Sequence, residues 1–418
     1  MTTEHHTNNA RELAFSLPLD QIDCSDPGLF EQDTVGHYFE RLRRDDPVHR
    51  TRTRLFGDFW SVTRYQDIMA VDTNHQVFSS DWSNGGISIL DRPAEHRGHS
   101  FINLDPPAHD GQRKAVSPIV APANLMNVGP LIRERTCNVL DGLPHNETFD
   151  WVERVSIELT TLMLATLFDF PLEDRKLLTY WSDVATSAPE FDSELVQTFE
   201  QRTDELKKMA RYMGRLWNER VNAPPSSDLI SMLAHDPTTR NMSPIEFMGN
   251  CILLIVGGND TTRNSMSGGL LAMCQNPAEW AKLRANPALL DSMVPEVIRW
   301  QTPLAHMRRT ATQDIELAGK QIRKGDKVVM WYYSGNRDAA AIDQPDRFII
   351  DRARPRQHIS FGFGIHRCVG NRLAELQLKI LWEEILQRFP VIEVVGEPRR
   401  ARSNFVRGFT QLPVRIPG

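Results

Sequence analysis

The residue best placed to do chemistry in this sequence is a cysteine at the entrance of a predicted helix. Cys368 lies in the run Phe361-Gly-Phe-Gly-Ile-His-Arg-Cys-Val-Gly370, just before an apolar stripe with helical spacing over 371–389 that ends at Pro390. The first amides of such a helix have no partner within it, so they can donate to a sulfur anion whose charge the helix dipole favours. A lone cysteine is more often a small buried hydrophobic residue. These surroundings favour a stabilised thiolate instead.

The glycines of the same run give a second indication. Gly362, Gly364 and Gly370 remove side chains that would keep a flat ligand away from the backbone, and they allow a tight turn that presents the sulfur. Phe361 can shield the sulfur from water. Together these residues indicate a site for a large planar group.

The run resembles the haem-binding loop of the cytochromes P450, FGxGxHxCxG, and every defined position matches. The resemblance implies haem b (iron protoporphyrin IX) as the cofactor and Cys368 as the axial ligand of its iron, since this thiolate favours O–O cleavage. It also implies that His366 contacts a haem propionate. Phe361, Gly362 and Gly370 are then expected to be cofactor-binding residues.

A second helix is predicted upstream. Ser243-Pro-Ile-Glu246 combines an N-cap serine, a proline at the first helical position and a glutamate three residues after the cap, and the helix continues to Asn276-Pro277. It contains Gly257-Gly258, which costs roughly 1 kcal/mol per glycine relative to alanine. The pair indicates a bend or the close approach of something large. A buried core helix with a tolerated kink is the alternative.

The segment Gly257-Gly-Asn-Asp-Thr-Thr262 resembles the oxygen-activation signature of the same family. Splitting oxygen requires protons in a pocket otherwise kept dry. Asp260 can relay protons from solvent, and the Thr261 hydroxyl can hold bound oxygen and an ordered water, so these two are the expected catalytic residues. Helical spacing places Leu253 and Val256 on the face of Asp260, bordering the substrate.

Glu296 and Arg299 stand at i and i+3 of a predicted helix and can form a pair. In isolation such a pair is usually a surface contact worth little. The segment resembles the ExxR motif of P450s, and Pro345, Phe348 and Arg352 match the later PxxFxxxR motif. A structural triad of Glu296, Arg299 and Arg352 is therefore implied, with an architectural role.

Three further charged residues match positions that bind haem propionates in this family. Residues 104–113, Leu-Asp-Pro-Pro-Ala-His-Asp-Gly-Gln-Arg, resemble the LDPPxHxxxR segment, which implies that His109 and Arg113 bind propionates. Arg309 matches a third such position, and Arg308 beside it is a possible substitute. Each alone could be a plain surface residue, but the motifs together span 104–370 in the family's order.

Composition excludes several other classes of protein. The net charge of −6 provides no basic field for nucleic acid. Five cysteines, odd in number and without CxxC spacing, argue against a disulfide framework and a zinc knuckle and favour a reducing cytoplasm. No segment approaches the ~20 apolar residues of a membrane span, and no secretion signal is found.

The overall pattern predicts a mainly α fold with small β-sheets (α+β), and the resemblance implies the P450 fold. Residues 1–30 are expected to be an irregular leader, and 31–418 a single large haem domain, acting as a monomer. The pattern is mostly helical to about residue 300. The segment 314–330 alternates apolar and polar residues around Gly319 and Lys324-Gly325, which predicts a β-hairpin.

The resemblance implies a monooxygenase that inserts one atom of O2 into an unactivated C–H bond. The chain carries no flavin or iron–sulfur segment, so a ferredoxin with its ferredoxin reductase is expected to supply the electrons. A set of arginines expected near the thiolate side could form a docking patch for an acidic partner, unless they are solvated or haem-bound. These are Arg113, Arg354, Arg356, Arg367 and Arg372.

The segments 257–265, 307–319, 331–338 and 403–408 resemble bacterial hydroxylases of terminal methyl groups, and we favour medium-chain alkane and fatty-acid ω-hydroxylases. Steroid side-chain terminal hydroxylases of actinobacteria are the alternative. The entrance is expected at 87–90 and 185–199. The expected substrate walls, which core residues would resemble, are Leu253, Val256, Gly257, Leu304, Ala305, Met307 and Phe409.

Two functions from other classes remain open at this point. A peroxygenase would use the same thiolate loop with hydrogen peroxide, but the family members that do so lack the acid and alcohol pair that Asp260 and Thr261 supply. A haem sensor or carrier without catalytic activity is the second.

Overall fold

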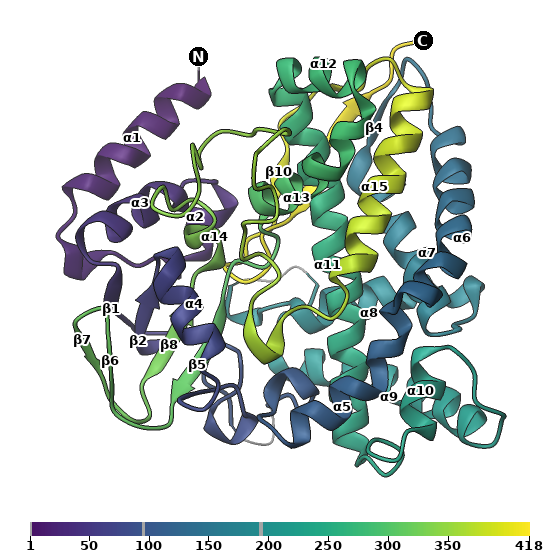
Figure 1. Cartoon of the computed structure of the whole chain (residues 1–418), viewed down its shortest axis with the longest axis horizontal. Helices are drawn as coiled ribbons and strands as arrows, with labels where there is room; N and C mark the ends of the chain where they lie inside the picture. Colours follow the sequence, from purple (N-terminus) through teal and green to yellow (C-terminus); the bar gives the residue numbers. More distant parts are fainter. Residues whose placement is uncertain (1, 94–96, 192–194) are drawn as a thin grey trace.

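Helices dominate the molecule, and most of them gather on one side of it, beside a smaller region that contains the main sheet (Figure 1). The structure is a computed structural model that describes residues 2–93, 97–191 and 195–418. Its α-helices are α1 (Thr2–Ser16), α2 (Pro27–Glu31), α3 (Val35–Asp45), α4 (Tyr65–Thr73), α5 (Ala108–Val116), α6 (Pro122–Asp141), α7 (Glu158–Leu167), α8 (Lys176–Thr186), α9 (Phe199–Val221), α10 (Leu229–His235), α11 (Pro244–Gln275), α12 (Pro277–Ala285), α13 (Leu290–Gln301), α14 (Tyr332–Gly335) and α15 (Asn371–Arg388).

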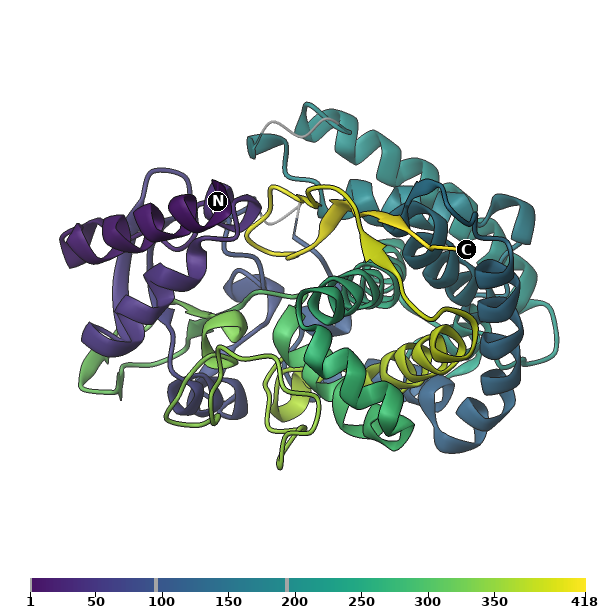
Figure 2. The same ribbon diagram turned by 90° about the horizontal axis from the view of Figure 1, so that it is seen from above.

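The long helix α11 runs through the middle of the helical side (Figures 1 and 2). The predicted capping box starts it: Ser243 Oγ accepts from the Glu246 amide at 3.4 Å, and Glu246 Oε2 accepts from the Ser243 amide at 2.9 Å. Buried residues of α7, α13 and α15 pack around α11 in two large hydrophobic clusters. This cap therefore fixes the start of the helix that carries the predicted oxygen-activation residues.

The sheets are small, as predicted, and the largest has the strand order β1-β2-β8-β5-β3. Its strands β1 and β2 were not predicted, because short half-buried strands within a helical stretch leave a weak pattern. The strands are β1 (Val48–Thr53), β2 (Gly57–Val62), β3 (Phe78–Ser79), β4 (Thr148–Asp150), β5 (Met307–Ala311), β6 (Ile315–Leu317), β7 (Lys320–Ile322), β8 (Lys327–Met330), β9 (Glu393–Val394), β10 (Arg399–Arg400), β11 (Phe409–Gln411) and β12 (Pro413–Arg415).

The predicted hairpin over 314–330 is confirmed only in its first half. Strands β6 and β7 pair around a turn at Ala318 and Gly319, which both have positive φ. Strand β8 leaves the hairpin and instead pairs with β5 and, in parallel, with β2. Residues 327–330 are all buried in the larger sheet, and this burial outweighs the local alternation.

The prediction of an irregular leader over residues 1–30 is wrong. Residues 2–16 form α1, and Asp26 caps α2 by accepting from the Gly28 amide. Ala14 is fully buried in a cluster with Phe30 and Phe39, so tertiary burial stabilises a segment whose polar composition gives little helical signal. Among the described residues no single helix is long and apolar enough to cross a membrane. The bent pair 108–120 and 122–141 reaches that length and composition only when taken together.

Candidate functional site

One cavity of about 870 Å³ brings together most of the predicted site residues. Its walls come from the middle of α11, the loop before α15, strand β5, the loop 85–90 and the C-terminal segment 403–405. The predicted site residues that line it are Cys368, His366, Phe361, Gly362, Gly370, Arg113, Arg309, Thr261, Gly257, Leu253, Val256, Leu304 and Met307. Segments separated by hundreds of residues therefore converge on one site.

The loop that carries Cys368 has the tight turn that its glycines predicted. Gly362 and Gly364 have φ of 66° and 63°, and a Cβ on Gly364 would lie 2.5 Å from the Asp72 carbonyl oxygen. The Cys368 amide donates to the Phe361 carbonyl at 2.8 Å, which closes the loop. This geometry directs the sulfur into the cavity.

The surroundings of the Cys368 sulfur act on its charge in opposite directions. Burial raises the pKa of the Cys368 thiol, while the Gly370 amide and the nearby Arg113 and Arg367 lower it. The sequence predicted the amide contribution, and Gly370 provides it. A bound metal ion would deprotonate this thiol outright.

The two glycines of α11 serve different contacts. A Cβ on Gly257 would meet nothing within 4 Å, so this position leaves the helix open toward the cavity. A Cβ on Gly258 would lie 2.8 Å from Leu164 Cδ2, so this position allows α7 to approach closely. The Thr261 hydroxyl faces the cavity and donates to the Gly257 carbonyl at 2.9 Å. The sequence predicted a bend or the close approach of something large at this glycine pair. In the structure Gly257 faces the cavity and Gly258 faces α7.

The sequence predicts that Asp260 lies on the helix face bordering the substrate, but in the structure Asp260 does not line the cavity. Its carboxylate is fully buried between α11 and α8, where Oδ1 accepts from Ser182 Oγ at 3.1 Å and from Asn259 Nδ2 at 3.0 Å. Leu253 and Val256 do line the cavity. Packing against α8 therefore decides the orientation of Asp260, which helical spacing alone did not reveal.

Asp260 is nevertheless connected to the surface. Arg263 Nη2 lies 3.1 Å from Asp260 Oδ1 and 2.7 Å from Asp183 Oδ1, and the Asp183 side chain is 36% exposed. Burial raises the pKa of Asp260 although Arg263 opposes this effect, and its Oδ2 has no hydrogen-bond partner among the described residues. A buried carboxyl group with a raised pKa and a charged path to solvent is suited to proton transfer.

Positive and imidazole groups gather at another part of the site. Arg113 and Arg309 line the cavity, and the His366 Nε2 is 2.7 Å from Ser80 Oγ. Burial and the charge of Arg309 lower the pKa of His366 to about 2, so the ring is neutral. His109 lies outside the cavity lining but its ring centroid is 4.5 Å from that of His366.

These groups fit the carboxylates of a haem. The His109 Nε2 and the His366 Nδ1 are buried without a hydrogen-bond partner in the described part of the chain, which is costly unless a ligand satisfies them. Two arginines beside them supply charge, and the open face at Gly257 leaves room for a planar group. The residues present therefore fit haem b, with Cys368 as its iron ligand.

The neighbouring residues Arg308 and Arg309 of β5 point to opposite sides of the strand, and only Arg309 lines the cavity. Arg309 Nη2 donates to Asp72 Oδ1 at 2.9 Å and faces the cavity. Arg308 is held on the other side of the strand by Asp91 at 2.6 Å and by the Ser88 carbonyl at 3.1 Å. Successive side chains of a strand point to opposite faces, so Arg308 cannot substitute for Arg309.

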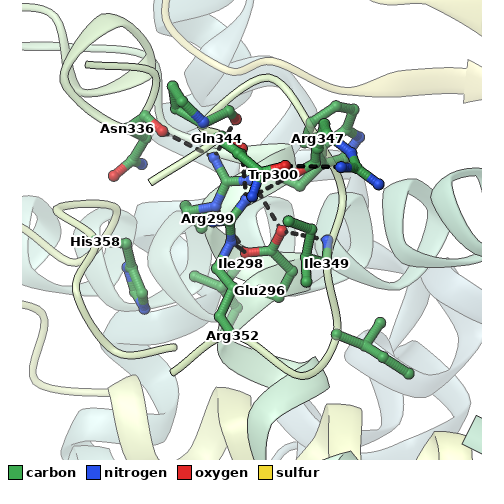
Figure 3. Close-up of polar contacts among 12 residues, drawn as sticks. Glu296, Ile298, Arg299, Trp300, Asn336, Gln344, Arg347, Ile349, Arg352 and His358 are labelled. Carbon is green, nitrogen blue, oxygen red and sulfur yellow. Dashed lines mark hydrogen bonds and ion pairs between the residues drawn. The ribbon is translucent and has the colours of Figure 1, made fainter. Parts of the chain in front are cut away.

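The predicted triad of Glu296, Arg299 and Arg352 is present, with Glu296 and Arg299 buried and Arg352 partly buried (Figure 3). Arg299 donates two hydrogen bonds to Glu296, at 2.7 and 2.9 Å, and Arg352 Nε donates a third at 2.8 Å. The remaining three donors of Arg299 bind the carbonyls of Asn336, Pro345 and Arg347 at 2.9, 2.8 and 3.1 Å. The triad therefore fastens α13 to the irregular segment that precedes the cysteine loop.

Two predicted substrate residues lie elsewhere. Ala305 is fully buried in the cluster that contains Trp331 and Tyr333, and Phe409 packs in the large cluster around α13 and α15. Neither lines the cavity; Phe405, in the same C-terminal segment, does. The sequence indicated the correct segment but not the correct residue, because the packing of Phe409 against distant helices has no sequence signature.

The two segments predicted to form the entrance both contribute to the cavity wall. Ile87 to Leu90 and several residues between Ala185 and Phe199 line the cavity, while 192–194 lie outside the described residues. The sequence did not predict other members of the wall, because no motif or periodic pattern connects them with the site. They include Arg92, Arg202, His306 and Phe405.

Comparison with known proteins agrees with this site. The family model described as Cytochrome P450 matches residues 35–416. A structure titled Cytochrome P450-153 from Novosphingobium aromaticivorans is 46% identical, with a TM-score of 0.89 over 94% of this chain and 99% of that chain. CYP153D17 from a Sphingomonas species is also 46% identical, with a TM-score of 0.89 over 96% of this chain and all of that chain.

Curated relatives have more varied names. Linalool 8-monooxygenase from Pseudomonas putida is 36% identical over 95% of this chain and 99% of its own length. Steroid C26-monooxygenase from Mycolicibacterium smegmatis is 30% identical over 90% of this chain and 89% of its own length. With the match over 35–416, these findings show that the chain belongs to the cytochrome P450 family of haem b monooxygenases.

Proposed function

We propose that this monooxygenase hydroxylates the terminal methyl group of a medium-chain alkane or fatty acid. The observation that carries the proposal is the group of apolar side chains that line the same cavity as Cys368, which we call the apolar wall. This wall includes Leu253, Val256, Leu304, Met307 and Phe405. A terminal C–H bond is stronger than its secondary neighbours, so the wall must hold the chain end near the reacting centre and keep the other carbons away.

Bound haem supplies an iron centre that activates O2 for insertion into a C–H bond. Cys368 would ligate the iron, while Arg113, Arg309 and His366 would hold the propionates, with His109 behind them. Among this chain's own groups, Asp260 would take protons from the surface on the side of Asp183, while Arg263 stays protonated and holds the two carboxylates.

The Thr261 hydroxyl would hold the proton at the cavity wall, since it is the hydroxyl next to the open face at Gly257. It needs a donor behind it, because its own hydrogen now points to the Gly257 carbonyl at 2.9 Å. In this proposal Asp260 supplies protons from the side of α11 that faces α8, and Thr261 holds them on the side that faces the cavity.

The P450 family uses O2 and a redox partner, and we propose a ferredoxin with its reductase as this partner in the cytoplasm. The arginines predicted for docking include four that are exposed: Arg354, Arg356, Arg367 and Arg372. Arg356 pairs with Glu375, while Arg113 is directed inward to the cavity and donates to the Arg367 carbonyl. The patch that we propose is therefore formed without Arg113.

Hydroxylation of a steroid side chain is the second candidate, because relatives named Steroid C26-monooxygenase are 30% identical to this chain. The experiment is a binding and product screen of the haem-loaded protein with octane, dodecanoic acid and cholest-4-en-3-one, using ferredoxin, reductase and NADH. We expect 1-octanol and 12-hydroxydodecanoic acid. Turnover of the steroid alone would reject the alkane and fatty-acid proposal.

The same assay distinguishes a monooxygenase from a peroxygenase and from a haem sensor. A peroxygenase would form product with hydrogen peroxide and no redox partner, and a haem sensor would form none. Product that depends on O2, NADH and the ferredoxin is the expected result.

A further inference from the structure

The mouth of the cavity carries two arginines that the haem site does not use. Arg92 follows the entrance loop 87–90, and Arg202 lies in the first turn of α9; both line the same cavity as Cys368 and Thr261. Their guanidinium carbons lie 5.1 and 5.7 Å from the centroid of the Phe199 ring. We call Arg92 and Arg202 the arginine pair. One aromatic ring thus holds two cations at the entrance.

Within the described residues, the arginine pair has no partner in an ion pair. Neither guanidinium forms an ion pair within the part of the chain that the structure describes, and the Nε atoms of both are buried without a hydrogen-bond partner there. Arg202 has one bond, from Nη2 to the Ala185 carbonyl at 2.6 Å. Glu190, at the same mouth, is exposed and influences both arginines only through space.

Burial and the neighbouring Arg92 lower the pKa of Arg202 to about 10, so both side chains remain charged at neutral pH. Two like charges that are partly removed from water, with no ion pair among the described residues, destabilise each other. An anion bound between them would relieve this repulsion. Guanidinium groups are well matched to carboxylates, since their planar donors can bind both oxygens.

We propose that the arginine pair binds the carboxylate of a medium-chain fatty acid, whose methyl end then extends along the apolar wall toward Cys368. This inference rests on the proposed terminal hydroxylation and chooses the fatty acid over the alkane. A hydrocarbon offers no group that compensates the buried charge at the mouth. Holding the carboxylate at a fixed place also sets which carbon reaches the reacting centre, so chain length becomes a determinant of regioselectivity.

The test compares dodecanoic acid with methyl dodecanoate, which has the same acyl chain but no charge. Dissociation constants are measured by calorimetry on the haem-loaded full chain, without turnover, for Arg92→Gln, Arg202→Gln and the double variant. Lys207→Gln is the matched control, because Lys207 lines the same mouth but its ammonium group already pairs with Asp204 at 2.9 Å.

We expect each arginine variant to weaken dodecanoate binding by about 10-fold or more, the usual effect of losing a charged hydrogen-bond partner. Binding of the ester and the behaviour of Lys207→Gln should change little. Equal weakening of acid and ester would show that the arginines only shape the mouth, and an equal loss in Lys207→Gln would show a general charge effect. Either result would overturn the proposal.

Binding and product analysis separate this inference from the proposed reaction. A charge-selective loss in the arginine variants, with the acid oxidised away from its terminus, would reject terminal hydroxylation and keep the carboxylate site. Terminal hydroxylation of octane and of the ester, with no charge-selective effect in the variants, would reject the carboxylate site alone.

Discussion

The Asp72 carboxylate accepts a hydrogen bond from the Arg309 guanidinium at 2.9 Å, and both side chains are buried. Its second oxygen accepts from the Tyr332 hydroxyl at 3.0 Å and from the Phe363 amide at 2.7 Å. One acid on α4 therefore holds both the arginine assigned to a propionate and the loop that carries Cys368.

Asp72→Asn should lower the free energy of unfolding by about 3–5 kcal/mol, because a buried arginine loses its counter-charge. Urea denaturation measures this loss, and the ratio of haem to protein after purification should fall with it. Asp314→Asn is the control, since Asp314 pairs with Arg323 at 2.8 Å on the surface and such pairs contribute about 0–1 kcal/mol. Equal losses in both variants would contradict the role assigned to Asp72.

Cys368→Ser should abolish the thiolate spectrum of the reduced carbon monoxide complex and eliminate monooxygenase activity, because an alcohol oxygen replaces the sulfur at the cavity wall. Absorption spectra before and after carbon monoxide addition measure the change. Cys137→Ser, at a partly buried cysteine that donates to Glu384, should keep the wild-type spectrum. A thiolate spectrum that survives in Cys368→Ser would mean that another residue is the ligand.

Thr261→Ala should retain haem but divert electrons from product to hydrogen peroxide, because the hydroxyl next to Gly257 is the group that holds a proton at the cavity wall. The measurement is the ratio of product and peroxide to NADH consumed. Thr261→Ser keeps the hydroxyl and should remain largely coupled. Full coupling in the alanine variant would remove Thr261 from proton delivery.

Asp260 should make the protein less stable as the pH rises. Burial raises the pKa of Asp260 in the folded state above its ordinary value of 3.8. At a pH between the unfolded and the folded pKa, the folded state therefore keeps a proton that the unfolded state has lost. The stabilisation is complete below about pH 3.8 and is lost as the pH passes through the raised pKa. Asp260→Asn cannot titrate, so the unfolding free energy of the wild type should fall relative to that of the variant. Denaturant titrations from pH 4 to pH 8 measure this difference, and parallel curves would contradict the raised pKa.

The parts of the site that are defined by local chain geometry could be predicted from the sequence. The capping box of α11, the glycine turn before Cys368 and the pairing of Glu296 with Arg299 each depend on residues a few positions apart. The strand alternation that separates Arg308 from Arg309 is also local, although the sequence alone left that choice open.

The parts that depend on packing between distant segments could not be predicted. Asp260 turns toward Ser182 because α8 lies beside α11, and the two residues are 78 positions apart. Asp72 reads as an ordinary polar residue of a short helix until Arg309 and Phe363 are placed against it. The arginine pair likewise depends on two separate segments that meet at the Phe199 ring.

The capping box at Ser243 and Glu246 also restricts how this sequence can change length. Each residue inserted into an α-helix rotates everything after it by about 100°. A one-residue insertion between the cap and Gly257 would move Thr261 to the helical position of Thr262, and it would bring the Val256 side chain to the position of Gly257 that is open toward the cavity. The distance along the chain from Ser243 to Thr261 is therefore as firmly constrained as the identity of either residue.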